Sequence, residues 1–237
     1  MRRSIILILS CFTSYSAYAQ STTALVWEAS TSVNYKLNKD WSFNSSLAHR
    51  TVWLDNKQFG ESGLDVRLAF AELNQFATYI IHPKLKASVG YKYRWLEPTV
   101  DERFFEHRIT QQIAMIHRTQ IIRLSSRFRS EQRIFTRSFA QRLRYRFSID
   151  FPLSGESLDR NEFYFLASNE VTYEIRKNHP NSWGNRITSG LGYLFGDITK
   201  LQLSFTYRTD NFTRQSQNRL FVETGLFFNV RSNNEPE

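Results

Sequence analysis

Hydrophobic and polar residues alternate along most of this chain with a period of two. Between Leu25 and Leu37 the odd positions carry mainly apolar or aromatic side chains, and the even positions carry mainly polar or charged ones. Similar runs return at 85–95, 139–151 and 187–207. Successive side chains of a β-strand point to opposite faces, so this period indicates strands with one apolar and one polar face. The sequence therefore predicts an all-β protein.

Turn-forming residues such as Asn38-Lys39-Asp40 and His82-Pro83-Lys84 divide the alternating pattern into segments. The eleven segments are 24–37, 41–54, 64–81, 85–96, 104–117, 121–135, 139–151, 162–175, 185–195, 201–209 and 218–230. Segment 64–81 is long enough to hide an additional strand near Glu72–Gln75. Because single-chain bacterial barrels have even strand numbers, we expect about twelve strands, with about ten as the alternative.

The strand lengths favour a membrane barrel over a soluble sandwich. Most segments are about twice as long as an ordinary globular strand, and a transmembrane strand needs about 9 to 11 residues to cross the hydrocarbon. Rings on one face and arginines on the other match a lipid-facing side and a lumen-facing side. We predict one antiparallel up-and-down transmembrane β-barrel over residues 20–237, with a periplasmic sandwich as the alternative.

The alternation also predicts which side chains face outward. These are Val33, Tyr35, Tyr91, Tyr93, Leu143, Tyr145, Phe147, Leu191, Tyr193 and Phe205. Amphipathic rings are favoured at membrane interfaces, so we expect Trp41, Trp53 and Trp95 near the two rims of the barrel.

The first nineteen residues have the parts of a secretory signal in order. Arg2 and Arg3 form a basic start, 5–12 is a short apolar run, and Ala17-Tyr18-Ala19 is an A-x-A cleavage site. We predict a cleaved signal peptide over 1–19 and a bacterial outer-membrane location, with outer-membrane lipid and the barrel-assembly machinery as partners. The alternative is a lipoprotein signal that ends at Cys11.

The composition excludes several kinds of functional site that depend on cysteine. Cys11 is the only cysteine, so cleavage after Ala19 leaves 218 of 237 residues and no thiol for a disulfide, a metal site or a nucleophile. Loss of Arg2 and Arg3 lowers the formal net charge from +9 to +7. Such a basic balance could attract nucleic acid, but the export signal and the strict alternation argue against that partner.

Charged residues concentrate on one face of consecutive strands. Arginine that faced lipid at mid-depth would cost about 2 to 4 kcal/mol each, so this face must look into the lumen. The predicted lumen charge network comprises Glu106, Arg108, Arg123, Arg127, Arg129, Glu131, Arg133, Arg142, Arg144, Arg146, Glu170 and Arg186. It could line a pore that attracts a small anionic solute, or it could fill a narrow barrel and hold it shut.

Several of these charged runs resemble a known family. Glu106-His107-Arg108, the run 127–133, the run 142–146, Asn185-Arg186-Ile187 and the run 190–193 are together similar to domain of unknown function 2490. The resemblance covers most of the mature chain. It implies an outer-membrane β-barrel and no assigned reaction.

Charge pairing predicts a register for one hairpin. If the chain reverses through Thr119 and Gln120, then Glu106 lies opposite Arg133 and Arg108 lies opposite Glu131. Opposite charges directly across neighbouring strands stabilise the pairing, whereas like charges destabilise it.

The functional hypothesis is a barrel without enzymatic activity, either a structural barrel or a narrow pore with an arginine-rich lumen. We predict no catalytic residue, metal ligand or cofactor. The alternative is an outer-membrane lipid-modifying enzyme of the hydrolase or acyltransferase type, for which His49, His107 and serines are candidates.

Overall fold

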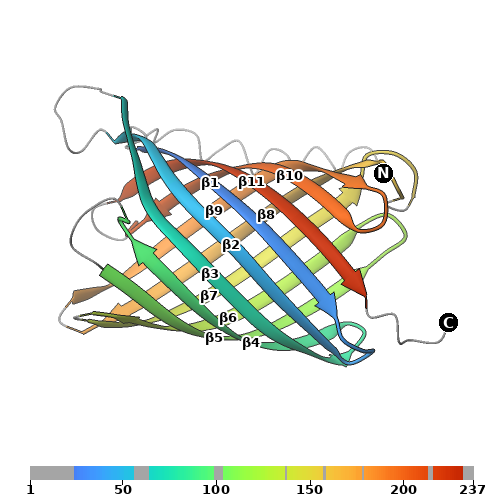
Figure 1. Ribbon diagram of the computed structural model, residues 1–237, viewed down its shortest axis with the longest axis horizontal. Helices are drawn as coiled ribbons and strands as arrows, with labels where there is room; N and C mark the ends of the chain where they lie inside the picture. Colours follow the sequence, from blue (N-terminus) through green and yellow to red (C-terminus); the bar gives the residue numbers. More distant parts are fainter. Residues whose placement is uncertain are drawn as a thin grey trace, which may run out of the picture.

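The alternating segments form eleven β-strands that close into a barrel in the computed structural model (Figure 1). The structure describes residues 24–55, 64–98, 104–136, 138–156, 159–177, 179–212 and 216–231. The strands are β1 (Ala24–Lys36), β2 (Trp41–Asp55), β3 (Leu64–His82), β4 (Leu85–Leu96), β5 (Phe104–Arg118), β6 (Arg123–Phe135), β7 (Phe139–Pro152), β8 (Phe163–Arg176), β9 (His179–Phe195), β10 (Thr199–Asp210) and β11 (Gln217–Arg231). The predicted all-β barrel is confirmed. The predicted signal peptide and Cys11 lie outside the described residues.

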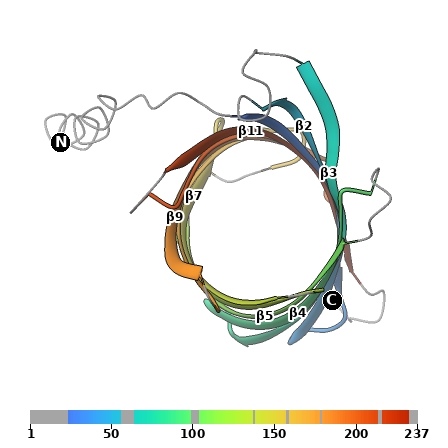
Figure 2. The same cartoon turned by 90° about the vertical axis from the view of Figure 1, so that its left-hand side faces the viewer.

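Each strand pairs with its neighbours in the sequence, and β1 closes the ring against β11 (Figure 2). All consecutive strands are antiparallel, while β1 and β11 are parallel in a register that runs from Ala24 opposite Arg219 to Lys36 opposite Arg231. In an up-and-down barrel with an odd number of strands, the first and last strands point the same way. The closing pair must therefore be parallel.

The expectation of about twelve strands, or ten, is wrong, because segment 64–81 is one strand. β3 pairs with β2 from Leu64 onward, but with β4 only from Phe70 to His82. Glu72 is paired on both sides, with Ala48 and with Arg94. The extra length of β3 thus follows from the stagger between neighbouring strands that barrel closure requires. The strand itself contains no turn.

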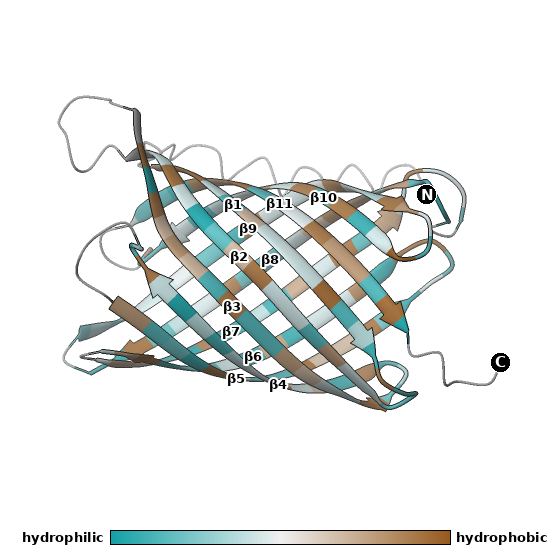
Figure 3. Cartoon of the chain, in the orientation of Figure 1, coloured by the Kyte–Doolittle hydropathy of each residue, from teal (hydrophilic) through white to brown (hydrophobic). Residues whose placement is uncertain are grey.

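The two faces of the barrel differ in the way that the alternation predicts. Large apolar side chains are exposed on the outer face, and Val33, Tyr91, Tyr145 and Phe205 are between 40 and 51% exposed. The ten residues predicted to face outward all have the outward parity. Figure 3 shows the resulting succession of hydrophobic and hydrophilic bands along the strands. No helix in the described part of the chain is long and apolar enough to span a membrane.

The interior is filled unevenly. Near the start of β1 a small apolar cluster of Ala24, Val26, Val52 and Phe221 is buried. The Arg50 guanidinium lies over the Phe221 ring, 4.8 Å from its centroid. The middle of the lumen holds charged side chains, and a large cavity opens near the ends of β1 and β11. The barrel therefore has buried charged side chains at its middle and a hollow at this mouth.

Candidate functional site: the charged lumen

Five carboxylates and eleven cationic side chains form one connected set of ion pairs across seven consecutive strands, β3 to β9. We call this set the charge girdle. Its members are Glu72, Lys92, Arg94, Glu106, Arg108, Arg127, Arg129, Glu131, Arg133, Arg142, Arg144, Arg146, Glu170, Glu174, Arg176 and Arg186. Side chains reach this shared interior because every second residue of each strand points into the lumen.

Glu106 and Glu131 are the centre of the girdle on β5 and β6. Glu106 is 0% exposed and accepts hydrogen bonds from Arg108 Nη2 at 2.6 Å and Arg133 Nε at 2.6 Å. Glu131 is 1% exposed and accepts one from Arg144 Nη1 at 2.9 Å, and Arg108 Nη1 lies 3.4 Å away. Arg108 thus joins the two carboxylates. Charge-assisted bonds of this kind are about twice as strong as neutral ones.

Glu170 extends the girdle toward β9. It is 1% exposed and accepts hydrogen bonds from Arg144 Nε at 3.0 Å and Arg146 Nε at 3.1 Å. Arg127 and Arg186 lie at 3.6 and 3.7 Å from the same carboxylate. One carboxylate is therefore shared by arginines from β6, β7 and β9.

The predicted register of the β5–β6 hairpin is wrong by two residues. Arg108 lies opposite Arg133, and Glu131 lies opposite Thr110. The turn contains the four residues 119–122 and not the two residues that were predicted. The Thr119 hydroxyl stabilises this turn, because it donates to the Ile122 carbonyl and accepts from the Ile122 N–H. The expected ion pairs form all the same, because long side chains reach diagonal neighbours on the adjacent strand.

The structure brings eleven of the twelve residues named from the sequence into the girdle. Arg123 lies apart at the mouth, where its Nε is 2.9 Å from Asp150 and its side chain is 43% exposed. Sequence reasoning missed five members, which are Glu72, Lys92, Arg94, Glu174 and Arg176. Parity would have found four of them, because Lys92 and Arg94 lie an even number of residues from Lys86 on β4, and Glu174 and Arg176 lie an even number from Glu170 on β8. Glu72 lies an odd number of residues from Asp65 and Arg67 of β3, so parity alone would have missed it.

The girdle carries an excess of positive charge. Its eleven cations exceed its five carboxylates by six within the described strands. Each carboxylate therefore has two or more cationic neighbours. A buried charge without a partner is costly, so the carboxylates hold together arginines that would otherwise repel one another.

The outer face carries the two histidines named as enzyme candidates. The His49 ring packs edge-on against Trp27, with centroids 5.0 Å apart, and His107 Nδ1 lies 2.7 Å from the Tyr91 hydroxyl. No serine hydroxyl of the described residues is bonded to a histidine. Nor does any group of three or more His, Cys, Asp or Glu residues there have an arrangement that could hold a metal ion.

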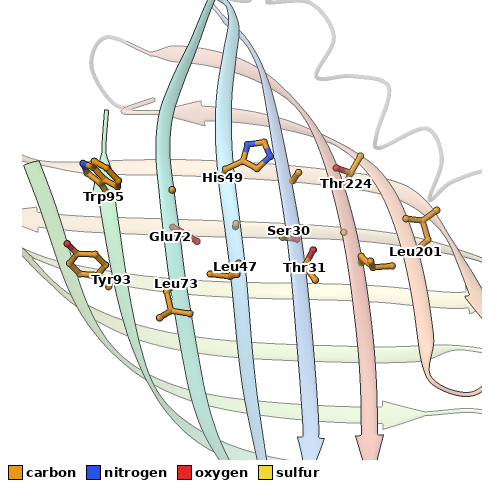
Figure 4. A pocket seen from close by; sticks show the side chains of 15 residues that line it. Ser30, Thr31, Leu47, His49, Glu72, Leu73, Tyr93, Trp95, Leu201 and Thr224 are labelled. Carbon is orange, nitrogen blue, oxygen red and sulfur yellow. The ribbon is translucent and has the colours of Figure 1, made fainter. Parts of the chain in front are cut away.

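A shallow hollow of about 570 Å³ surrounds His49 on this outer face (Figure 4). It forms because several outward positions carry small side chains, such as Ala29 and Ala71, between larger ones such as Leu47 and Tyr93. Glu72 lies at its base, but the carboxylate of Glu72 is bonded to Arg94 on the lumen side. The hollow is therefore apolar where it faces outward.

Fold and site together define a class, a closed β-barrel with an apolar outer face and a charged interior. Residues 26–221 match the family described as Protein of unknown function (DUF2490), and the chain belongs to that family. The family inferred from the charged runs is confirmed.

Other known proteins add little. No curated protein matches the chain. Among solved structures, the siderophore receptor PirA from Pseudomonas aeruginosa is similar, with 13% identity and a TM-score of 0.32 over 75% of this chain and 32% of that chain. The chain thus spans about a third of the receptor's length.

Proposed function

We propose that this protein is an outer-membrane β-barrel without enzymatic activity, whose charge girdle closes the lumen at mid-depth. The observation that carries the proposal is the burial of Glu106, Glu131 and Glu170, which are at most 1% exposed inside the barrel. Carboxylates that lined an open, water-filled channel would be exposed to solvent. Here arginines from several strands cover them, which supports a lumen that is filled at their level.

The membrane location is supported by the distribution of apolar side chains. Exposed large apolar residues occur on all eleven strands, whereas a soluble protein rarely exposes large contiguous apolar patches. Inside, the largest fully buried side chains are Glu106, Glu131 and Glu170. This inside-out arrangement suits a barrel whose solvent on the outer side is lipid. A cleaved signal over 1–19 and insertion by the barrel-assembly machinery complete the proposal.

Planar-bilayer conductance of the refolded protein tests the closure. We expect little or no steady conductance from the natural sequence. The double substitution Arg129→Ala with Arg144→Ala should raise conductance several-fold, because it shortens two girdle side chains and still leaves Glu131 with Arg108 and Glu170 with Arg146. The remaining positive excess should make that current anion-selective.

The matched control is Arg118→Ala with Arg123→Ala, which removes two lumen-facing arginines at the mouth and none from the girdle. Its conductance should stay at the level of the natural sequence. A large steady conductance of the unmodified barrel, or equal increases in both double variants, would contradict a girdle that closes the lumen.

The alternative function, an outer-membrane lipid-modifying enzyme, is not supported by the geometry of the two outward histidines. Hydrolysis or acyl transfer through a serine needs that hydroxyl within hydrogen-bond reach of a base. His49 packs on Trp27 and His107 bonds to Tyr91. Neither outward histidine is therefore arranged to activate a nucleophile.

A further inference from the structure

One mouth of the barrel contains a cavity of about 1040 Å³. It lies where β1 and β11 end, the end toward which their arrows point in Figure 1. We call it the basic vestibule, because seven cationic side chains and three carboxylates of the described residues line it. The cations are Lys36, Lys86, Arg118, Arg123, Arg146, Lys200 and Arg231, and the carboxylates are Asp150, Glu156 and Asp197.

Two of the three carboxylates are already engaged. Asp150 pairs with Arg123 at 2.9 Å, and Asp197 pairs with Arg160. Within the described part of the chain, Lys86 and Arg118 form no ion pair with a carboxylate. At least these two cations of the vestibule therefore have no carboxylate partner among the described residues.

Like charges also face each other across the vestibule wall. Arg118 lies directly opposite Arg123 in the β5–β6 register. Lys86 on β4 and Lys200 on β10 line the same cavity and are repelled by both arginines, although Asp150 also attracts Lys200. Directly opposed like charges are destabilising. A bound anion would relieve that repulsion, so the arrangement favours one.

The vestibule floor adds apolar and hydrogen-bonding groups. The Tyr164 ring is buried flat over Gly192, where an added Cβ would lie 2.1 Å from Cζ of the ring. Leu194 and Phe227 line the same cavity, and the Tyr164 hydroxyl donates to Gln202 Oε1 at 3.5 Å. Cationic walls over a partly apolar floor suit an organic solute with several anionic groups better than a bare inorganic ion.

We propose that the basic vestibule binds a small soluble organic polyanion with at least two carboxylate or phosphate groups, held by Lys86, Arg118 and Lys200. The occupant is a solute and not a lipid headgroup, because the cavity lies inside the barrel wall. The inference goes beyond the proposed function and does not require the girdle to be closed. Failure of one therefore leaves the other standing.

Isothermal titration calorimetry of the full chain, refolded in a zwitterionic detergent at low salt, tests the inference with citrate and with fructose 1,6-bisphosphate. We expect at least one of them to bind and spermidine not to bind. The variant Lys86→Gln with Lys200→Gln should raise the dissociation constant at least about tenfold, which corresponds to about 1.4 kcal/mol, because it removes two of the three cations that hold the anion.

The matched control is Lys39→Gln with Lys84→Gln, which removes two exposed lysines from turns at the same mouth, outside the cavity lining. Its affinity should change less than about twofold, as expected for exposed charges. If neither polyanion binds, or if the control weakens binding as much as the vestibule variant, the inference fails. Should the double variant not refold, Arg118→Gln takes its place, with a several-fold loss expected and an unchanged affinity overturning the inference.

Discussion

At the scale of single residues, the girdle depends on its few carboxylates. Glu131 has Arg108, Arg129 and Arg144 within 3.5 Å. Because cations outnumber carboxylates in the girdle, the loss of one carboxylate leaves several arginines with more repulsion than attraction. The loss of one arginine, in contrast, leaves each carboxylate with another partner.

The first prediction at this scale concerns Glu131→Ala. We expect it to lower the free energy of unfolding by about 3 to 5 kcal/mol, the usual cost of removing one partner from a buried ion pair. Equilibrium urea unfolding of the refolded barrel measures it. His49→Ala and His107→Ala, on the outer face, should cost clearly less, and an equal cost at either histidine would contradict the role given to Glu131.

The reversal of the Arg108–Glu131 pair is not expected to restore that loss. Arg108 also donates to Glu106 at 2.6 Å, so Arg108→Glu would set a second carboxylate beside Glu106. Arg108→Glu with Glu131→Arg should therefore remain destabilised in the same urea experiment. Full recovery would mean that Arg108 serves Glu131 alone.

At the scale of strands, glycines make room for inward-facing rings. Gly90 lies opposite Phe76 across β3 and β4, and Gly192 lies opposite Tyr164 across β8 and β9. A Cβ at Gly90 would lie 2.3 Å from the Phe76 ring. Each ring covers the backbone of the neighbouring strand, and such pairs fix the register between two strands.

The prediction for these pairs concerns Gly192→Ala. The new methyl group would collide with Tyr164, so we expect a loss of about 1 to 3 kcal/mol from overpacking. Thermal unfolding followed by circular dichroism measures it. Tyr164→Ala in the same chain should remove the collision and make Gly192→Ala nearly neutral, whereas additive losses would show that the two residues do not touch.

Strand boundaries were predicted well where the alternation is strong and poorly where both faces are polar. β9 begins at His179 instead of 185, because Asn181, Ser182 and Asn185 hide the apolar face of its first half. Pairing with β8, which reaches from Tyr193 back to His179, decides that start. The turn predicted at Thr119 and Gln120 was too short, because it was chosen by charge pairing alone. Charge pairing does not predict the hydrogen bond from the Thr119 hydroxyl to the Ile122 carbonyl.

At the scale of the whole molecule, aromatic residues mark two rims. Trp41 is the first residue of β2, and Trp95 is next to the last residue of β4, at the opposite end of the barrel. Trp41 packs on Tyr79 with centroids 5.0 Å apart, and Trp183 packs on Tyr173 with centroids 4.6 Å apart. Rings in these positions would lie at the membrane interfaces if the barrel spans a bilayer as proposed.

Fluorescence quenching in reconstituted vesicles tests that placement. Lipids brominated near the headgroup should quench tryptophan fluorescence strongly, and lipids brominated at mid-chain should quench it weakly. Trp41→Phe should lower the quenched signal without changing the depth order of the remaining tryptophans. Stronger quenching by mid-chain bromine would mean that the rings lie at the centre of the bilayer or that the barrel is inserted differently.

The sequence by itself determined the class of fold, the outward parity and the charged lumen face. Those features follow from a period of two and from the cost of arginine in lipid, which are local properties of each strand. Only the tertiary structure decided the strand number, the parallel closure of β1 on β11, the register at Arg108 and Arg133, and which charges meet. These features depend on how far each strand is shifted along its neighbour in the closed barrel. That shift brings Glu174 to Arg133 and Glu72 to Arg94, and no pattern within a single strand predicts it.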